Sequence, residues 1–336
     1  RGLSLYVRNV FVMDQCRDLL PEYLRFVRGL VDSADLPLNV SREMVQQDRR
    51  IAQFRKVLVK RLLDRFAVVA RDDRERWTTI WEEVGPVIKE AFHYEPAVQE
   101  KVEPCLLFRT THGDDWSSLA DINGRMAEGQ DAIYYLAGDD LATLKSSPHL
   151  EIFREKGAEV LLLTDPIDNV ALVALEKLGG KTMRDAADPQ LNPSDIGVKV
   201  QDEPDKPADA DLGALAAKLT ELLSESVAEV RASRRLRDSA ACLVAGGDGP
   251  NAAVERMMKA MGQAMPERKR VLELNPTHPL IERLRALAEG TPDDPRIAEF
   301  GELLVDQALV AAGERPRDVA AFARRLSEVA AAALNA

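Results

Sequence analysis

The chain has 336 residues, a formal net charge of −11 and 46% hydrophobic residues. This length predicts two or three domains, and the composition is typical of a globular protein. The acidic balance argues against nucleic-acid binding, because a phosphate backbone needs a basic protein face. No apolar run reaches the roughly 18 residues that a membrane-spanning helix needs, so we expect no membrane partner.

The 3 cysteines, Cys16, Cys105 and Cys242, are far apart in the chain. An odd number of separated cysteines favours a reducing compartment and small buried core residues over a disulfide framework. The 4 histidines have no spacing typical of metal ligands, so we expect no metal site built on them.

The first 102 residues read as the end of an α/β unit followed by helices. A strand is predicted over 5–13 and a short helix or turn over 21–31. A long helix is predicted from Ser41 to about Ala67, because apolar residues from Ile51 to Phe66 recur at helical spacing. A second helix is predicted over about 73–92. We interpret the two helices as a connector.

Residues 103–200 alternate between short apolar runs and helical patterns. Strands are predicted over 105–109, 132–137 and 159–164, and helices over 119–126, 139–146, 150–156 and 168–178. This alternation indicates a small, mostly parallel sheet covered by helices.

A Pro- and Asp-rich stretch over 201–211 is the clearest domain boundary, and an α+β domain is predicted beyond it. Its expected helices cover 212–223, 251–261, 279–288, 294–312 and 316–334, and its expected strands cover 227–232, 241–245 and 271–274. The fold class is therefore α/β plus α+β.

The predicted helix start at Ser41 carries a charge that needs a partner. Ser41 is a good N-cap and Glu43 suits the positive end of the helix dipole, but the cation of Arg42 does not. Arg42 therefore needs an anion, which is either a nearby carboxylate or a phosphate bound at the helix N-terminus. The chain has no phosphate-binding loop of the G-x-x-x-x-G-K-[ST] type, so we expect no complete nucleotide pocket within it.

Two further patterns suggest surfaces for macromolecules. One side of the helix predicted at 251–261 and its continuation carries Val254, Met257, Met258, Met261 and Met265. Methionine is flexible, so this side is either an adaptable binding surface or part of the domain core. The last two predicted helices carry apolar stripes, which either join a second copy in a four-helix bundle or pack within one subunit. The stripes are Ile297, Phe300, Leu304 and Ala308, then Val319, Phe322, Leu326 and Val329.

The segment 26–47, FVRGLVDSADLPLNVSREMVQQ, resembles the ninety-kilodalton heat-shock protein chaperones in their bacterial HtpG type. The likeness continues in LYVRNVFVMDQC before it and in MAEGQDAIYY, KSSPHL, EVLLLTDPID and ELNP after it, in family order. It implies part of a middle α/β subdomain over 1–66, a helical connector over 67–102 and a small α/β subdomain over 103–200. The linker over 201–211 then leads to a C-terminal dimerisation domain over 212–336. The chain would be a piece of a longer protein.

The resemblance implies roles for these residues. Arg42 would contact the γ-phosphate of ATP, with Asn39 and Gln46 in the same catalytic loop. ATP and Mg²⁺ would be bound mainly by an N-terminal domain outside this chain, so this chain alone would be inactive. The methionine-rich helix would bind unfolded client proteins, with Trp116 as a further candidate for client contact. Asn169 and Val170 depart from the acidic residue and Trp of some relatives, which weakens the case for a client patch there.

The resemblance also implies a bacterial cytoplasmic stress-response protein that forms a homodimer and cooperates with the seventy-kilodalton chaperone system. Two alternatives belong to other classes. One is a stand-alone metal-dependent α/β hydrolase, with Asp139, Asp165 and Asp168 after predicted strands as Mg²⁺ ligands. The other is a dimer scaffold with no nucleotide role.

Overall fold

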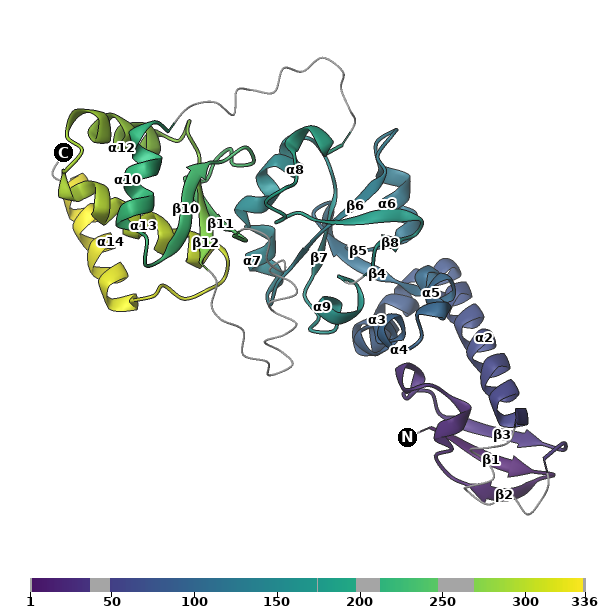
Figure 1. The fold of residues 1–336 in the computed structure, drawn as a ribbon. Helices are drawn as coiled ribbons and strands as arrows, with labels where there is room; N and C mark the ends of the chain where they lie inside the picture. Colours follow the sequence, from purple (N-terminus) through teal and green to yellow (C-terminus); the bar gives the residue numbers. More distant parts are fainter. Residues whose placement is uncertain (1, 37–48, 174, 198–211, 247–268, 335–336) are drawn as a thin grey trace. The chain divides into compact units, whose positions relative to one another are not determined.

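The structure is a computed structural model that describes residues 2–36, 49–173, 175–197, 212–246 and 269–334 (Figure 1). It confirms the predicted mixture of α/β and α+β architecture. The chain divides into two compact units. Unit 1 contains residues 1–108, 115–124 and 170–180, and unit 2 contains residues 109–114, 125–169 and 181–336. Among the described residues, no helix is long and apolar enough to cross a membrane.

Unit 1 begins with a three-stranded sheet in the order β2-β1-β3. The strands are β1 (Leu3–Val7), β2 (Val10–Met13) and β3 (Gly29–Ser33), with β1 antiparallel to β2 and parallel to β3. The single strand predicted over 5–13 is therefore wrong: it is a hairpin. Its turn residues Arg8 and Asn9 have φ of 51° and 62°, in the left-handed region that tight hairpin turns require.

Two long helices follow, α2 (Arg49–Asp72) and α3 (Arg74–Lys89), with the Asp73 carboxylate accepting the N–H of Arg76 at the start of α3. The ring centroids of Phe66 and Trp77 lie 5.5 Å apart, and those of Trp77 and Trp81 lie 6.3 Å apart. Trp77 is fully buried and its indole Nε1 donates to the Cys105 carbonyl at 2.8 Å. The Phe66–Trp77 contact joins α2 to α3, whereas Trp77 and Trp81 both belong to α3. The predicted boundary at 66/67 falls inside α2, so no break in the helix marks it.

Short helices complete the described part of unit 1. They are η1 (Arg17–Leu19), η2 (Glu22–Leu24), α4 (Ala91–Tyr94), η3 (Pro96–Val98), α5 (Gln99–Val102), η4 (Glu103–Cys105) and α6 (Leu119–Arg125). The turn or helix predicted over 21–31 thus corresponds to η2 followed by strand β3.

A six-stranded sheet has the order β5-β4-β7-β6-β9-β8. Its strands are β4 (Leu107–Thr110), β5 (Gly113–Ser118), β6 (Ala132–Ala137), β7 (Val160–Leu163), β8 (Lys177–Leu178) and β9 (Lys181–Asp185). Central β6 is parallel to both β7 and β9, which confirms the parallel part of the prediction, whereas β4 is antiparallel to β7. Every residue of β6 and β7 is buried.

Helices in this region are short. They are α7 (Leu141–Lys145), η5 (Pro148–Leu150), α8 (Glu151–Glu155), α9 (Asp168–Ala171) and η6 (Pro193–Asp195). The helix predicted over 168–178 is wrong beyond Ala171, because the chain turns there into β8 and then passes through Gly179 and Gly180 into β9. Both glycines have positive φ, which fits this tight connection.

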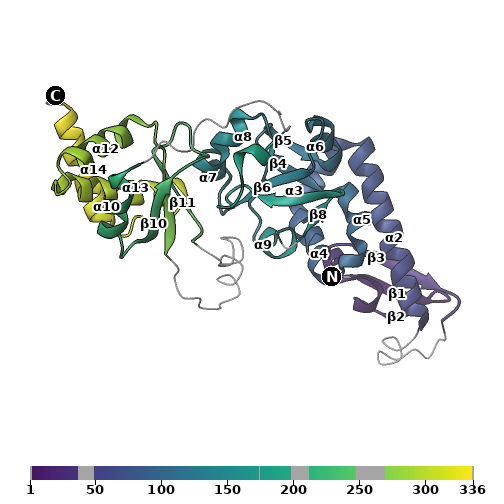
Figure 2. The same cartoon turned by 45° about the horizontal axis from the view of Figure 1, so that its top comes forward.

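The described residues of 212–334, which are 212–246 and 269–334, form a second layered body within unit 2, which we call the C-terminal module. Its strands β10 (Val227–Ala232), β11 (Ala241–Val244) and β12 (Arg270–Leu274) have the order β10-β12-β11. Its described helices are α10 (Ala214–Leu222), α12 (Pro279–Gly290), α13 (Pro295–Ala311) and α14 (Val319–Leu334). The helices gather on one side of the strands in both views (Figure 1, Figure 2).

The core of the C-terminal module lies between its strands and α10, α12 and α13. Packing there is close: a Cβ added at Gly301 of α13 would lie 2.7 Å from a methyl carbon of Leu219 on α10. The small α/β module, by which we mean residues 125–169 and 181–197, has its own core around Tyr134 and Phe153, whose rings meet edge to face at 4.9 Å. Both bodies belong to unit 2, and the predicted linker over 201–211 lies outside the described residues.

Candidate functional site

Two predicted sites lie outside the described residues. Arg42, Asn39 and Gln46 fall within 37–48, and the methionine-rich helix falls within 247–268. Their roles therefore stay predictions from sequence. The nearest described element to the first group is α2, which begins at Arg49.

Trp116 lies in strand β5. The residue is half-buried, and its indole Nε1 donates to the Glu82 carboxylate at 3.0 Å. Its carbonyl accepts from Arg74, which also pairs with Asp121. Trp116 is thus held by polar contacts within unit 1, with part of its ring at the surface. A role in client contact stays a prediction.

Helix α13 contributes most of its apolar stripe to its own module. Ile297 and Leu304 are 0% exposed and Ala308 is 2% exposed, all within the C-terminal core. Phe300 is partly buried against the same core. These side chains are already covered within one subunit, and a place for Ile297, Leu304 and Ala308 in a dimer interface stays a prediction.

Helix α14 is different, because its apolar side chains are largely uncovered. Val319 is 58% exposed, Leu326 is 49% exposed and Val329 is 38% exposed, while Phe322 is half-buried. An apolar helix face left in water favours association with another apolar surface. The prediction of a dimer contact therefore rests on α14.

Ion pairs connect α14 and the segment before it to α13. Arg325 lies 3.4 Å from the carboxylate of Asp306 and 3.8 Å from that of Glu302, which also accepts from Arg317 at 3.0 Å. Asp306 is 2% exposed, and its second oxygen, Oδ1, has no hydrogen-bond partner. Burial raises the pKa of Asp306, against the opposing effect of Arg317 and Arg325.

The aspartates considered as metal ligands lie in turns and near helix starts. Within the described residues, no group of three or more His, Cys, Asp or Glu side chains is arranged to hold a metal ion. Asp168 is buried and accepts the N–H of Asp165 at 3.2 Å, which is a turn contact. The N-cap of α7 is Asp140, whose carboxylate accepts from Thr143.

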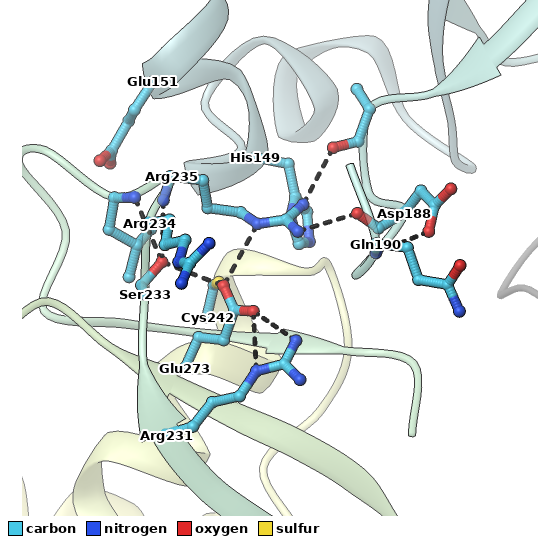
Figure 3. Close-up of polar contacts among 12 residues, drawn as sticks. His149, Glu151, Asp188, Gln190, Arg231, Ser233, Arg234, Arg235, Cys242 and Glu273 are labelled. Atoms are coloured by element: carbon cyan, nitrogen blue, oxygen red, sulfur yellow. Dashed lines mark hydrogen bonds and ion pairs between the residues drawn. The ribbon is translucent and has the colours of Figure 1, made fainter. Parts of the chain in front are cut away.

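A buried polar cluster that the sequence reasoning missed lies where the small α/β module meets the C-terminal module (Figure 3). The carboxylate of Glu273, on β12, is 4% exposed. It accepts from Arg231 at 2.8 Å and from Ser233 at 3.0 Å, and it lies 3.2 Å from Nε of Arg235. A signal was available, because Glu273 interrupts the apolar strand 271–274 and an arginine-rich segment lies at 231–237.

The other side of the same cluster is Glu151, at the start of α8. Its carboxylate accepts the backbone N–H groups of Arg237, Asp238 and Ser239 at 2.5, 2.9 and 3.0 Å, and the Ser239 hydroxyl at 2.5 Å. Successive N–H groups that point at one carboxylate form an anion-binding concavity. Here a side chain from the other module fills it.

The three cysteines are buried thiols. Cys16, Cys105 and Cys242 are all free and buried, as predicted for small core residues. Burial raises the pKa of all three thiols, that of Cys105 to about 12. The neighbouring Glu273 carboxylate raises the pKa of Cys242 further.

Comparison with known proteins gives a consistent answer over the whole chain. The family model described as "Hsp90 protein" matches residues 1–336. The chain is 43% identical over 332 residues to "Chaperone protein HtpG" of Geobacter sulfurreducens, covering 98% of this chain and 51% of that protein. It is 42% identical to the protein of the same name from Myxococcus xanthus, over 97% of this chain and 50% of the relative. The protein of that name from Bordetella avium is 43% identical, over 97% of this chain and 52% of that relative. The chain thus spans about half the length of the curated relatives it matches.

Proposed function

The chain belongs to the Hsp90 protein family, and from this membership we propose that it is the middle and C-terminal part of an ATP-dependent chaperone of the HtpG type. One observation carries the proposal: the alignments with chaperone relatives, at 42–43% identity, cover 97–98% of the chain. The longer protein would hydrolyse ATP, form a homodimer and bind unfolded client proteins in the bacterial cytoplasm, in cooperation with the seventy-kilodalton chaperone system.

The proposed part of this chain in ATP hydrolysis is a donated cation. Arg42 would reach the γ-phosphate of ATP bound, with Mg²⁺, mainly by the missing domain. A guanidinium offsets negative charge that develops during phosphoryl transfer, and its fork can hold two phosphate oxygens at once. Asn39 and Gln46 would orient Arg42 or the phosphate. This role is supported by the sequence around Ser41, where Arg42 lies at a predicted helix start, a position that favours anions.

The proposed dimer contact is α14. Its exposed residues Val319, Leu326 and Val329 make an apolar face that a second copy of the same helix could cover, as in an isologous two-fold interface. The ion pairs from Arg325 and Arg317 to α13 would set the direction in which this face points.

The proposed client surface is the predicted methionine-rich helix, because flexible thioether side chains adapt to many apolar partners. The test uses the longer protein and measures light scattering from a chemically unfolded client. Changing Met257, Met258 and Met261 together to serine should reduce the suppression of aggregation, whereas the control Met126→Ser should not. Full suppression by the triple variant, with an unchanged circular dichroism spectrum, would remove this helix from the proposed surface.

A further inference from the structure

The polar cluster between the small α/β module and the C-terminal module has features of a reversible joint. Its members come from both modules: Glu151 from the first, and Arg235 and Glu273 from the second (Figure 3). Both modules lie in unit 2, so these contacts are internal to one compact body.

Arg235 is the residue that reaches across. Its side chain is only 7% exposed, and its Nε lies 3.2 Å from the Glu273 carboxylate of its own module. Its Nη1 and Nη2 donate to the carbonyls of Ala186 and Asp188, just beyond β9, at 3.2 and 2.8 Å. The planar guanidinium is therefore fixed on one edge by its own module and presents its other nitrogens to backbone oxygens of the neighbouring one.

Glu151 reaches in the opposite direction. Glu151 belongs to the small α/β module and is 8% exposed. Its carboxylate accepts hydrogen bonds from the backbone N–H groups of residues 237–239, which belong to the C-terminal module. The two connections are reciprocal: an anion of one module holds backbone donors of the other, and a cation of the second holds backbone acceptors of the first. An exposed ion pair between Arg237 and Glu155 lies beside them.

Each module has an apolar core of its own, and a further small apolar cluster contains Leu236, the chain neighbour of Arg235. The core of the small α/β module is built from residues between 132 and 196, and the core of the C-terminal module from residues between 212 and 309. The two sets share no residue. When a polar joint opens, water can replace each lost hydrogen bond, whereas opening an apolar core exposes surface that water does not stabilise.

We propose that Glu151 and Arg235 form a polar clamp that fixes the orientation of the C-terminal module on the small α/β module and can open without unfolding either. Arg235 and Glu151 are positioning residues in this arrangement, and Glu273 holds Arg235 in place. In the proposed chaperone, the clamp would couple movement of the middle region to the dimerising end. The clamp itself does not depend on that function.

Hydrogen–deuterium exchange of the full chain tests the clamp, with Arg231→Ala as the matched control. Arg231 pairs with the same Glu273 carboxylate, and its hydrogen bonds among the described residues stay within the C-terminal module. In Arg235→Ala we expect the amides of 237–239, which donate to Glu151, to exchange about tenfold faster or more, because loss of the Arg235 contacts opens the joint as a whole. Exchange in strands β6 and β10 should stay at the wild-type rate, which shows that both modules remain folded.

Glu151→Gln gives a second route to the same answer from the other module, should Arg235→Ala fail to fold. It keeps the size of the side chain, removes its charge and replaces one acceptor oxygen with a donor. We expect faster exchange at 237–239 and also at 186–188, where the residue itself makes no contact, because opening affects the joint as a whole. Faster exchange at 237–239 alone would reduce Glu151 to a local loop contact and overturn the clamp. Unchanged exchange in both variants would also overturn it. Loss of ATP hydrolysis plays no part in this readout, so failure of the clamp and failure of the proposed function are distinguishable.

Discussion

Truncation of Leu326 on α14 should weaken the dimer of the longer protein without unfolding it. Leu326 is 49% exposed in the single chain, so about half of its side chain is available for burial by a partner. The neighbouring Val319 and Val329 extend the same apolar face. Leu326→Ala keeps the helix, since alanine has the highest helix propensity, and removes most of the apolar surface at this point.

The size of the effect follows from the exposed fraction. Complete burial of a leucine side chain stabilises by about 1.5–3 kcal/mol, so the exposed half contributes roughly 1 kcal/mol per copy. A two-fold interface contains the residue twice, which gives about 2 kcal/mol per dimer. At about 1.4 kcal/mol per factor of ten, the dimer dissociation constant should rise about 30-fold.

Sedimentation analysis over a range of concentrations measures this constant. The matched control is Leu222→Ala on α10, since Leu222 is also a helical leucine and is 40% exposed. The control should leave the dissociation constant at its wild-type value. An unchanged constant for Leu326→Ala, or an equal rise for Leu222→Ala, would refute the assignment of α14 to the dimer contact.

Other outcomes follow from the described contacts. Trp77→Phe should lower the free energy of unfolding by about 1–3 kcal/mol in urea, because the buried Cys105 carbonyl loses its donor. Trp116→Phe should lower it by less, because Trp116 is only half-buried and its partner Glu82 can be hydrated. A thiol reagent at pH 8 should leave all three cysteines of the folded chain unmodified and modify them in denaturant; rapid modification of the folded chain would contradict their burial. The pKa of Asp306 is higher in the folded chain than in the unfolded chain, where it is about 4. As the pH rises from about 4 through the raised pKa, the unfolded state loses the proton more readily, and the free energy of unfolding of the wild type falls. Asp306→Asn should therefore gain stability relative to the wild type across that rise in urea unfolding, and a constant difference would contradict it.

Much of the fold could be predicted because amphipathic spacing and short apolar runs are local signals. Strands β6 and β7 and helices α10, α12 and α13 begin and end within a few residues of the predicted bounds. The hairpin at Arg8–Asn9 was missed because apolar residues continue on both sides of the turn. The prediction of helix after Ala171 is wrong because the apolar pattern continues past the end of α9, whereas the Gly179-Gly180 pair with positive φ marks the entry to β9.

The sites were harder to predict because a pattern shows which face is apolar but not what covers it. The stripes on α13 and α14 are alike in sequence, yet the α13 stripe is covered by its own module and the α14 stripe is largely open. The clamp joins residues such as Glu151 and Ser239, which are 88 positions apart. Such pairing depends on the tertiary fold, so spacing within one segment could not reveal it.

The most direct test of the proposed chaperone cycle is phosphate release from ATP by the longer protein, its Arg42→Ala variant and residues 1–336 alone. The account predicts turnover by the longer protein, a loss of about a hundredfold or more in the variant with ATP binding retained, and no turnover by residues 1–336. Arg49→Ala, an exposed arginine at the start of α2, is the control and should keep wild-type turnover. Wild-type turnover in Arg42→Ala, or turnover by residues 1–336 alone, would contradict the assignment of Arg42 as a residue donated to a separate nucleotide site.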